Sequence, residues 1–470
     1  MNAQPANDSY TAMTRADPAW RREMRARLGF DGMTLVVGLG ITGLSCARLL
    51  RDLGLPVEVT DSRMEPPGLE AARREIADVP LHLGGFSAPA LERCARILLS
   101  PGVASDEPYV LSARARGVNV IGDIELFARC ADAPVAAITG SNGKSTVTAL
   151  LGAMAQADGR VVRVGGNIGT PALDLLQAVP PELYVLELSS FQLETTASLN
   201  ARAAVILNLS PDHLDRYPDM QAYLEAKLRV YAGDGAVVVN RDDPSLCACV
   251  PERRSVVSFG AGVPAAGDYG LVVAAGQTWL AYGDEQMIAV DELGLRGSHN
   301  ALNALAALAL GAAVGLTRAG MLAALRAFTG LPHRMQMVGE RRGVRWFNDS
   351  KGTNVGATLA ALGGLPGRVV LIAGGLGKGQ DFSPLRDLAA AKARAVVLIG
   401  RDAPLIEAAL HNVASIHYAG DMREAVARAA ALAQAGDSVL LSPACASFDM
   451  FKGYEDRGRR FVAAFEELAP

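Results

Sequence analysis

The chain has 470 residues, half of them hydrophobic and 5% aromatic, and its formal net charge is −4. This length predicts roughly two to four domains with well-filled cores, and the small net charge excludes a global electrostatic attraction to nucleic acid or to an anionic membrane. The six cysteines form no CxxC pair, so we expect reduced thiols in a cytoplasmic protein.

Residues 1–32 are polar and lack the apolar core of a secretion signal. We expect them to form an N-terminal extension that is loose or weakly helical, and the arginine-rich run at 21–27 fits a solvated helix face. No apolar run in the chain approaches the roughly 18 residues of a membrane span, so we expect no membrane insertion.

The first block of alternating strand and helix patterns covers residues 33–122. Short β-branched runs alternating with helical patterns predict a parallel sheet. Gly38, Gly40 and Gly43 form a GxGxxG turn between a strand and a helix, and Asp61 ends the next strand. Such a turn lets backbone amides approach a pyrophosphate of a dinucleotide or of a UDP-sugar, and a tight turn without a ligand is the alternative.

The second block covers residues 123–330 and begins with another strand, turn and helix. The turn reads ITGSNGKST (138–146), in which Lys144 can meet phosphates and Ser145 or Thr146 can place a hydroxyl on Mg²⁺. Ile138 stands where the P-loop pattern begins with glycine, and a lysine-capped loop is the alternative. Residues 258–294 predict an antiparallel patch, and an Ala-rich helix follows at 299–315.

Further polar residues follow apolar strands of this block. Glu187 lies inside the apolar run LYVLELSS, where an unpaired carboxylate is costly, and either Mg²⁺ or neighbouring backbone donors would satisfy it. Asn208, Asp212, His213 and Asp215 cluster after the next strand; His213 fits a metal or phosphate contact and an ordinary loop histidine equally well. Lys227 carries no signal beyond a snorkelling lysine. His299, Asn300 and Asn303 begin the Ala-rich helix and suit the edge of a ligand.

The third block covers residues 331–470 and again alternates strands and helices. A polar run at 348–354 contains Lys351, a glycine-rich loop contains Lys378, and Ser442 and Ser447 follow the last strand. The chain as a whole therefore predicts an α/β protein with three domains, one Mg²⁺–nucleoside triphosphate site and one further phosphate-binding turn.

A series of motifs resembles the Mur ligases. ITGSNGKST, VLELSSFQLE, NLSPDHLDRY, HN (299–300), LPHR and NDSKGTN occur in this order, with GLGITGLS, GDIELF and LLSPACASFDMFK pointing to the members that add glutamate. The resemblance runs from about residue 33 to the C-terminus. It implies a Rossmann-like N-terminal domain that binds a UDP-sugar, a central P-loop ATPase-like domain and a Rossmann-like C-terminal domain that binds an amino acid.

The resemblance also implies a reaction. ATP would phosphorylate the carboxylate of UDP-N-acetylmuramoyl-L-alanine (UDP-MurNAc-L-Ala), and glutamate would attack the acyl phosphate to form an amide bond in peptidoglycan precursor synthesis. The catalytic positions are matched by Lys144, Glu187, His213 and Lys227. The metal positions, for two Mg²⁺ ions and with the lysine carbamylated, are matched by Ser145, Glu187, His213 and Lys227.

The resemblance also matches residues of this chain to the substrate-binding positions of the family. ATP contacts are matched by Gly140, Ser141, Asn142, Gly143, Lys144, Ser145, Thr146, Asn303, Arg334 and Asp349. Contacts to the UDP-substrate are matched by Gly38, Gly40, Ile41, Thr42, Gly43, Ser62, Arg63, Asn167 and His213. The glutamate pocket is matched by Lys351, Thr353, Lys378, Ser447 and Tyr454.

Some residues depart from the family pattern, and several of them cluster at the glutamate pocket. Gly352 replaces the usual alanine, Leu376 stands where many relatives carry aspartate, and Phe448 and Tyr454 replace leucine and phenylalanine. These changes leave the activation chemistry alone and concern the acceptor, so we expect D-glutamate and keep L-glutamate as the alternative.

Three other functions stay open at this point. A NAD-dependent dehydrogenase would explain the first glycine turn and Asp61, but not the phosphate loop or the third block. A folylpolyglutamate synthase would share the central motifs without the leading domain, and a nucleotide-gated binding module would need no third domain with lysines. For the ligase we expect a cytoplasmic monomer that acts on small molecules and binds no nucleic acid.

Overall fold

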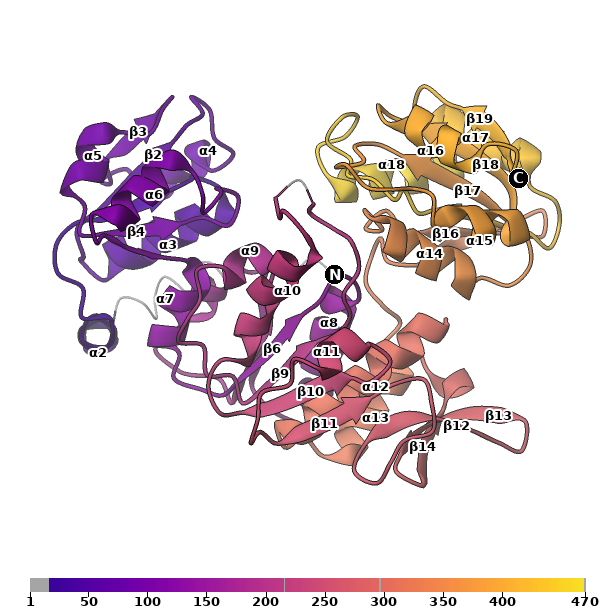
Figure 1. Cartoon of the computed structure of the whole chain (residues 1–470), viewed down its shortest axis with the longest axis horizontal. Coiled ribbons are helices and arrows are strands. Elements are labelled where there is room, and N and C mark those ends of the chain that lie inside the picture. The colour runs from indigo at the N-terminus through magenta and orange to yellow at the C-terminus, as the bar shows by residue number, and fades with distance from the viewer. Residues whose placement is uncertain (1–16, 215, 296, 469–470) are drawn as a thin grey trace.

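Three sheets carry the fold of the computed structural model, which describes residues 17–468 except 215 and 296. The strands of the sheets lie within residues 34–121, 135–289 and 336–441 in turn. The chain therefore forms three α/β lobes, as the sequence predicts, with the central lobe below and between the first and the third (Figure 1).

The first lobe is a five-stranded parallel sheet whose strand order reverses beside β1. Apolar β1 residues are fully buried on both faces, as expected where helices cover both sides of a parallel sheet. In sheet order its strands are β3 (Leu81–Leu83), β2 (Val57–Asp61), β1 (Thr34–Val37), β4 (Arg96–Leu99) and β5 (Asn119–Ile121). Its helices are α3 (Ile41–Asp52), α4 (Leu69–Glu75), α5 (Ala88–Arg93) and α6 (Pro108–Ala115).

The central lobe is a nine-stranded sheet, and α7 (Asp123–Cys130) leads into it from the first lobe. Its strands are parallel from β7 to β12, and β12 to β14 form the expected antiparallel patch. In sheet order they are β14 (Glu285–Ala289), β13 (Gln277–Tyr282), β12 (Tyr269–Ala274), β11 (Val256–Phe259), β10 (Ala236–Asn240), β9 (Ala203–Ile206), β6 (Val135–Thr139), β8 (Leu183–Glu187) and β7 (Val162–Gly166). The helices are α8 (Lys144–Ala157), η1 (Ala172–Leu175), α9 (Ser190–Leu193), α10 (Met220–Leu228), η2 (Arg229–Tyr231), α11 (Pro244–Cys247), η3 (Val290–Glu292), α12 (Ser298–Ala313) and α13 (Arg318–Ala327).

The third lobe is a six-stranded sheet, parallel except for the hairpin of β15 and β16 at one edge. Two apolar clusters cover its two faces. In sheet order the strands are β15 (Gln336–Arg341), β16 (Val344–Asn348), β20 (Ser438–Leu441), β17 (Val369–Gly374), β18 (Ala393–Ile399) and β19 (Ser415–Tyr418). The helices are α14 (Val355–Gly364), α15 (Leu385–Lys392), α16 (Ala403–Leu410), α17 (Met422–Leu432) and α18 (Tyr454–Glu466).

Four strands were not predicted from the sequence, and three of them are sheet edges. The fourth, β11, begins at Val256 and pairs in parallel with β10 and β12, so the antiparallel part of the stretch 258–294 begins only at β12. β3, β15 and β19 lie at the margins of their sheets, and most of their residues are only partly buried or exposed. Edge strands carry polar side chains and lack the continuous apolar run that marks a buried strand. Their sequences therefore look like loops.

The N-terminal extension, expected to be loose or weakly helical, contains in its second half a helix that is packed against the protein. Residues 18–28 form helix α2 (Pro18–Leu28), which begins at the N-cap Asp17 and ends at Gly29 with φ 57°. The prediction of a solvated arginine face is correct, but Trp20, Met24 and Leu28 are buried on the opposite face. This apolar stripe at helical spacing holds the helix against the body of the protein. Residues 1–16 lie outside the described part of the chain.

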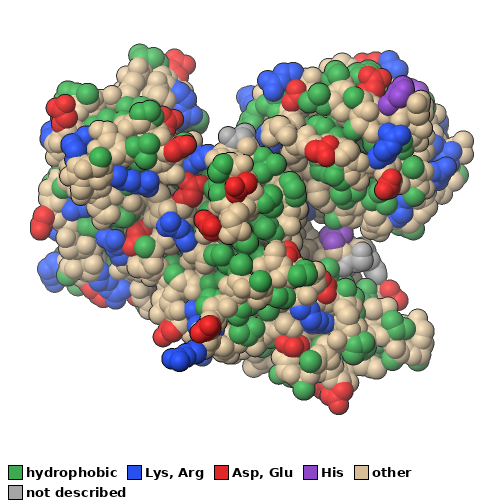
Figure 2. Space-filling view, viewed as in Figure 1, with side chains coloured by type: hydrophobic (Ala, Val, Ile, Leu, Met, Phe, Trp, Pro, Cys, Tyr) green, Lys and Arg blue, Asp and Glu red, His purple; other side chains and the backbone are tan. Residues whose placement is uncertain are grey.

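A notch separates the first and third lobes above the central lobe (Figure 2). The carboxyl ends of the parallel strands, where ligands of open α/β sheets bind, supply the turns after β1, β6 and β16 that carry the predicted motifs. Across the described residues, no helix is both long and apolar enough to cross a membrane.

Candidate active site

The phosphate loop connects β6 to α8 and is held from the neighbouring strand. Gly140 and Gly143 have φ of 145° and 82°, which side chains disfavour. The Asn208 side chain accepts from the Asn142 amide at 2.8 Å and donates to its carbonyl oxygen at 3.1 Å. Lys144 lies over the loop, and its Nζ donates to the carbonyl oxygens of Gly140 and Ser141 at 2.8 and 2.9 Å. The loop is thus shaped for an anion before one arrives.

Ser145, at the start of α8, joins two lobes. Its hydroxyl donates to Oε2 of Glu187, and the Arg334 guanidinium from the start of the third lobe donates to the Ser145 oxygen. Glu187 ends β8 and is 2% exposed; its other oxygen accepts from Asn167 at 3.0 Å. The buried Glu187 that the sequence singled out is therefore satisfied by side chains of the phosphate-loop region, and not by backbone donors alone.

The Glu187 and Ser145 pair fits a magnesium ion. Both offer oxygen ligands, which a hard divalent cation prefers. Among the described residues there is no group of three or more His, Cys, Asp or Glu side chains that could hold a metal. Mg²⁺ commonly binds through one or two protein oxygens and takes its remaining ligands from phosphates and water. The donor set thus suits an ion that arrives with a nucleotide.

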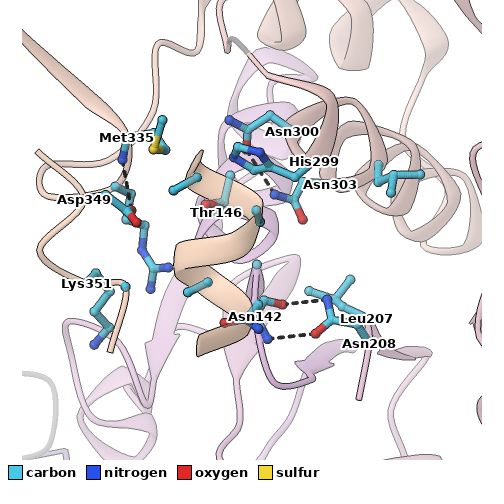
Figure 3. A pocket seen from close by; sticks show the side chains of 18 of the residues that line it. Asn142, Thr146, Leu207, Asn208, His299, Asn300, Asn303, Met335, Asp349 and Lys351 are labelled. Carbon is cyan, nitrogen blue, oxygen red and sulfur yellow. Dashed lines mark hydrogen bonds between the residues drawn. The ribbon is translucent and has the colours of Figure 1, made fainter. Parts of the chain in front are cut away.

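A cavity of about 330 Å³ extends from the phosphate loop to the N-terminus of α12. Met335, Asp349 and Lys351 of the third lobe lie on one side of it, and His299, Asn300 and Asn303 on the other (Figure 3). The Asn303 amide donates to Asn300 Oδ1 at 3.1 Å. His299 Nδ1 is buried, with no hydrogen-bond partner among the described residues. A ligand that supplies a partner there would remove the cost of that buried polar atom.

Asp349 differs from an ordinary surface carboxylate. It is 8% exposed, accepts from the Ser442 hydroxyl at 2.8 Å and from the Met335 amide at 3.2 Å. Burial raises its pKa from 3.8 to about 7. Burial also lowers the pKa of Lys351 to about 8. Both groups therefore change charge state near neutral pH at the mouth of the nucleotide cavity.

The glycine turn after β1 is built as predicted, but Asp61 is already occupied. A Cβ on Gly43 would lie 1.9 Å from the Gly38 carbonyl oxygen, so close packing requires glycine there. Asp61 is 2% exposed and accepts from the Leu39 amide at 2.7 Å and from Arg63 Nε at 2.9 Å. A dinucleotide site uses this acidic residue for a ribose hydroxyl. Its saturation by Arg63 weighs against the dehydrogenase alternative.

A larger cavity of about 1220 Å³ lies between the lobes. It brings together nearly all the predicted UDP-substrate residues with the Ser145 and Arg334 pair, and it shares Arg334, Lys351 and Leu331 with the nucleotide cavity. His213 is the predicted UDP-substrate residue outside its lining. The predicted residues in the lining are Gly38, Gly40, Ile41, Thr42, Gly43, Ser62, Arg63, Ser145, Asn167, Arg334, Lys351 and Tyr454.

His213 and Lys227 lie behind the phosphate loop and line neither cavity. Lys227 is 1% exposed; its Nζ donates to the Gly140 carbonyl oxygen at 3.0 Å and lies 4.3 Å from the centre of the Tyr223 ring. Burial lowers its pKa well below the ordinary value, so the snorkelling interpretation is wrong. His213 packs edge-on against Phe191, with ring centres 4.7 Å apart, and burial lowers its pKa to about 4.

The predicted glutamate residues do not all meet. The Lys351 ammonium lies 3.8 Å from the centre of the Tyr454 ring at the large cavity. Lys378 instead reaches the central lobe, where its Nζ lies 3.1 Å from Asp212 Oδ1. Thr353 and Ser447 line neither cavity; Ser447 is buried and Thr353 is half-buried. Lys351 and Lys378 therefore face different parts of the junction between lobes.

Asp212 receives a second contact from the third lobe. The Asn354 amide donates to Asp212 Oδ2 at 3.0 Å and to Asn142 Oδ1 in the phosphate loop at 3.2 Å. Burial opposes ionisation of Asp212, but the Lys378 ammonium keeps its pKa below the ordinary value. Asp212 is thus a charged docking point for the third lobe. Asp215, which the sequence places in the same cluster, lies outside the described residues.

Sequence reasoning missed three structural supports of the site. The sequence places Asn208 and Asn354 in polar runs without a specific role. In the structure, the side-chain amides of both residues form hydrogen bonds with Asn142 of the phosphate loop. Arg457 on α18 carried no signal at all. It is fully buried and donates to Ser350 Oγ at 3.0 Å, to the Ser350 carbonyl oxygen at 2.7 Å and to the Cys445 carbonyl oxygen at 3.0 Å. An arginine in a surface-like helical pattern gives no hint of such a role.

Comparison with known proteins agrees with this architecture. Three family models match in chain order: the Mur ligase MurD-like N-terminal domain at residues 32–122, the Mur ligase middle domain at 138–311 and the Mur ligase glutamate ligase domain at 333–445. The chain is 55% identical over 437 residues to UDP-N-acetylmuramoylalanine–D-glutamate ligase of Nitrosococcus oceani, covering 93% of this chain and 96% of that protein. It is 52% identical over 443 residues to the enzyme of the same name from Pseudomonas aeruginosa, covering 93% and 99%.

Solved structures share the fold at lower identity. UDP-N-acetylmuramate-alanine ligase MurC from Thermotoga maritima superposes with a TM-score of 0.60 at 21% identity, over 93% of this chain and 99% of that one. MurF ligase from the same organism, solved in complex with ADP, gives a TM-score of 0.58 at 20% identity, over 80% and 90%. Sequence motifs, fold and the high-identity relatives agree, and the chain belongs to the Mur ligase family.

Proposed function

We propose that the chain is an ATP-dependent ligase that joins D-glutamate to UDP-N-acetylmuramoyl-L-alanine, forming an amide bond in peptidoglycan precursor synthesis. One feature of the structure supports this proposal independently of the similarity to known ligases. The nucleotide cavity and the large inter-lobe cavity share Arg334 and Lys351, and Thr146 of one lies beside Ser145 of the other. A terminal phosphate and the carboxylate of a second substrate can therefore meet at one point.

The first step that we propose is transfer of the γ-phosphoryl group of ATP to the alanine carboxylate. The oxygen–phosphorus bond to ADP breaks, and a bond to a carboxylate oxygen forms, giving an acyl phosphate. Lys144 and Arg334 place two cations at the phosphate loop, where they offset charge that spreads over the transferring group. Bound Mg²⁺ would supply further charge neutralisation, with Ser145 and Glu187 as its protein ligands.

The second step is attack of the glutamate amine on the acyl carbon. The tetrahedral intermediate then releases inorganic phosphate, and the protons lost by the amine pass to solvent or to a base. Lys351 beside Tyr454, and Lys378 beside Asp212, are the cations available to a dicarboxylate. We infer that glutamate binds Lys378 while that ammonium keeps its ion pair with Asp212, with Thr353, Ser447 and Tyr454 forming the rest of its pocket.

We further infer that Lys227 carries a carbamate and, with His213, holds a second Mg²⁺. Only a neutral amine attacks carbon dioxide, and the lowered pKa of buried Lys227 favours that form. The nitrogen of the neutral amine gains a bond to carbon and loses one proton, so a neutral group becomes an anion; starting from the ammonium form, two protons are released. Native mass spectrometry of protein kept in bicarbonate is expected to show one added carbon dioxide that Lys227→Met lacks. An identical mass for the two preparations, after correction for the substitution, would contradict the carbamate.

The test of the ligase proposal is phosphate release from ATP and Mg²⁺ with UDP-MurNAc-L-Ala, run in parallel with D-glutamate and L-glutamate. We expect release that requires the UDP-substrate and D-glutamate together. Lys144→Ala is expected to abolish it, because the ammonium at the transferring phosphoryl group is lost. Release with L-glutamate alone would reverse the acceptor assignment, and no release with either would reject the function.

The remaining alternatives have weaker support. A dehydrogenase would use Asp61 to bind a ribose hydroxyl, but both oxygens of Asp61 already accept hydrogen bonds from Arg63. For a folylpolyglutamate synthase, the leading domain with its glycine turn would be without a purpose. The expectation of a cytoplasmic monomer, without nucleic acid, stays a prediction.

A further inference from the structure

Helix α2 and the three residues after it lie outside the family's domain models, the first of which begins at residue 32. Residues 17–31 are called the strap here. Trp20, Met24 and Leu28 of the strap belong to one apolar cluster that also contains residues of the first lobe and of the central lobe. The strap is therefore packed where those two lobes join, next to α7 (Figure 1).

The strap is bonded to the end of the connecting helix. Arg27 Nη1 donates to the carbonyl oxygens of Cys130 and Ala131, both at 3.1 Å. Cys130 is the last residue of α7, and the next element, β6, begins at Val135 in the central sheet. A cation at the C-terminal carbonyls of a helix satisfies acceptors that have no partner within the helix and interacts favourably with its dipole. This contact fixes the segment about which the first lobe would turn.

The other half of the strap is attached to the first lobe. The Asp31 carbonyl oxygen accepts from Arg96 Nη2 at 2.7 Å, and the Arg96 guanidinium carbon lies 3.9 Å above the centre of the Phe30 ring. Arg96 lies in β4 and is 9% exposed. Arg129 of α7 lies 5.9 Å from the same ring. One aromatic side chain thus lies between a strand of the first lobe and the connecting helix.

Helix α7, which the strap contacts, and the neighbouring helix α3 both have their N-termini at the substrate cavity. The N-terminus of α3 supplies Gly40 to Gly43 to the lining of the large cavity. Asp123, the first residue of α7, accepts from Gln192 at 2.8 Å, and Gln192 also lines that cavity. Near the opposite end of α3, Arg25 Nη1 lies 3.6 Å from the position that a Cβ would take at Gly54. The two bonds from Arg27 hold the far end of α7, and this sets the position of its near end beside the cavity.

We propose that the strap is a conformational brace that restricts rotation of the first lobe about α7, and so holds the UDP-substrate groups in place relative to the phosphate loop. The second half of this statement rests on the proposed function. The first half concerns only the arrangement of two lobes and is tested without any reaction.

The experiment measures the distance between the lobes in the full chain by pulsed electron spin resonance. Nitroxide labels are placed on Glu92→Cys in α5, which is exposed, and on the exposed native Cys247 of the central lobe, with Cys249→Ser to leave one label there. The other cysteines of the chain are buried. Arg27→Met removes both bonds to α7 while keeping the apolar stem. Arg22→Met, on the exposed face of the same helix, is the matched control.

We expect Arg27→Met to broaden the distance distribution, and the control to match the parent protein. An unchanged distribution in both Arg27→Met and Trp20→Ala would overturn the brace, even if either variant unfolds more easily. In turnover assays, Arg27→Met is expected to raise KM for UDP-MurNAc-L-Ala about fivefold, because its two partly exposed bonds together contribute about as much as one hydrogen bond of ordinary strength. KM for ATP is expected to stay unchanged. A broadened distribution with an unaltered KM would overturn the link to substrate placement. Absence of all turnover in the parent would reject the proposed function and leave the distance result standing.

Discussion

Asp212→Asn tests whether docking of the third lobe limits glutamate addition. The substitution keeps the size of the side chain and removes its charge. It breaks the ion pair with Lys378, which is largely buried because Asp212 is 8% and Lys378 19% exposed. It can also place the NH2 group of the new asparagine against the Asn354 amide, which now donates a hydrogen bond to Asp212. Because Asp212 belongs to the central lobe and both partners to the third, the substitution weakens the attachment of one lobe to the other.

The size of the effect follows from the strength of the interaction that the substitution removes. A hydrogen bond to a charged group contributes about 1.5 to 3 kcal/mol, and the reaction requires the closed arrangement. If closure is weakened by one such bond, kcat/KM for glutamate falls roughly 10- to 150-fold. The affinity for an ATP analogue with Mg²⁺, measured without the other substrates, is expected to change little, because the loop clamp by Asn208 is intact.

Steady-state kinetics with glutamate varied, and small-angle scattering of the ligand-free protein, check this prediction. We expect a larger radius of gyration together with the kinetic loss. Glu194→Gln is the matched control, since this carboxylate is held by Arg216 and Tyr217 of its own lobe. If Asp212→Asn leaves both the scattering and kcat/KM at the values of the parent protein, the docking argument is wrong.

Three further predictions concern individual residues. Burial raises the folded-state pKa of Asp349 from 3.8 to about 7, so the contribution of this residue to stability falls as the pH rises from about 4 to about 7. The free energy of unfolding of Asp349→Asn should therefore increase relative to that of the parent over this range, which urea titration at each pH measures. Arg457→Met leaves three buried acceptors without their donor and should cost about 3 kcal/mol in the same assay, at about 1 kcal/mol for each bond; a cost below about 1 kcal/mol would contradict its supporting role. Gly43→Ala should weaken UDP-substrate binding in calorimetry, since its Cβ would overlap the Gly38 oxygen, and wild-type affinity would refute the tight turn.

The sequence predicted those parts of the fold and site that depend on local patterns. Buried strands such as β6 and β8 are continuous apolar runs, and the turns after them carry glycine and polar residues within a few positions. The α/β class, the three lobes and the placement of Ser145 with Glu187 follow from such runs, since the carboxyl ends of neighbouring parallel strands share one edge. β6 and β8 are indeed neighbours in the sheet.

What the sequence could not predict depends on contacts between distant segments. The burial of Lys227 arises because α10 returns beneath the phosphate loop, and nothing within YLEAKLRVY marks that position. Arg457 and Asn354 are similar cases, because their partners are far away in the chain or in another lobe. The helical strap had a readable signal, an apolar residue every four positions from Trp20 to Leu28, but the surrounding arginines obscured it.

The cations of the site already have hydrogen-bond partners before substrates bind. This pairing affects how much each cation contributes to substrate affinity and to the reaction rate. Lys144 is held by two carbonyl oxygens of its own loop, and Lys378 by Asp212. A phosphate that takes over the Lys144 ammonium exchanges one set of hydrogen bonds for another, so the net gain in affinity is small. The benefit is that several cations can stand near one another without a bound anion, close to where charge accumulates in the transition state. Electrostatic groups that are positioned in advance need little reorganisation when the reaction occurs, so the pairing favours rate over ground-state affinity.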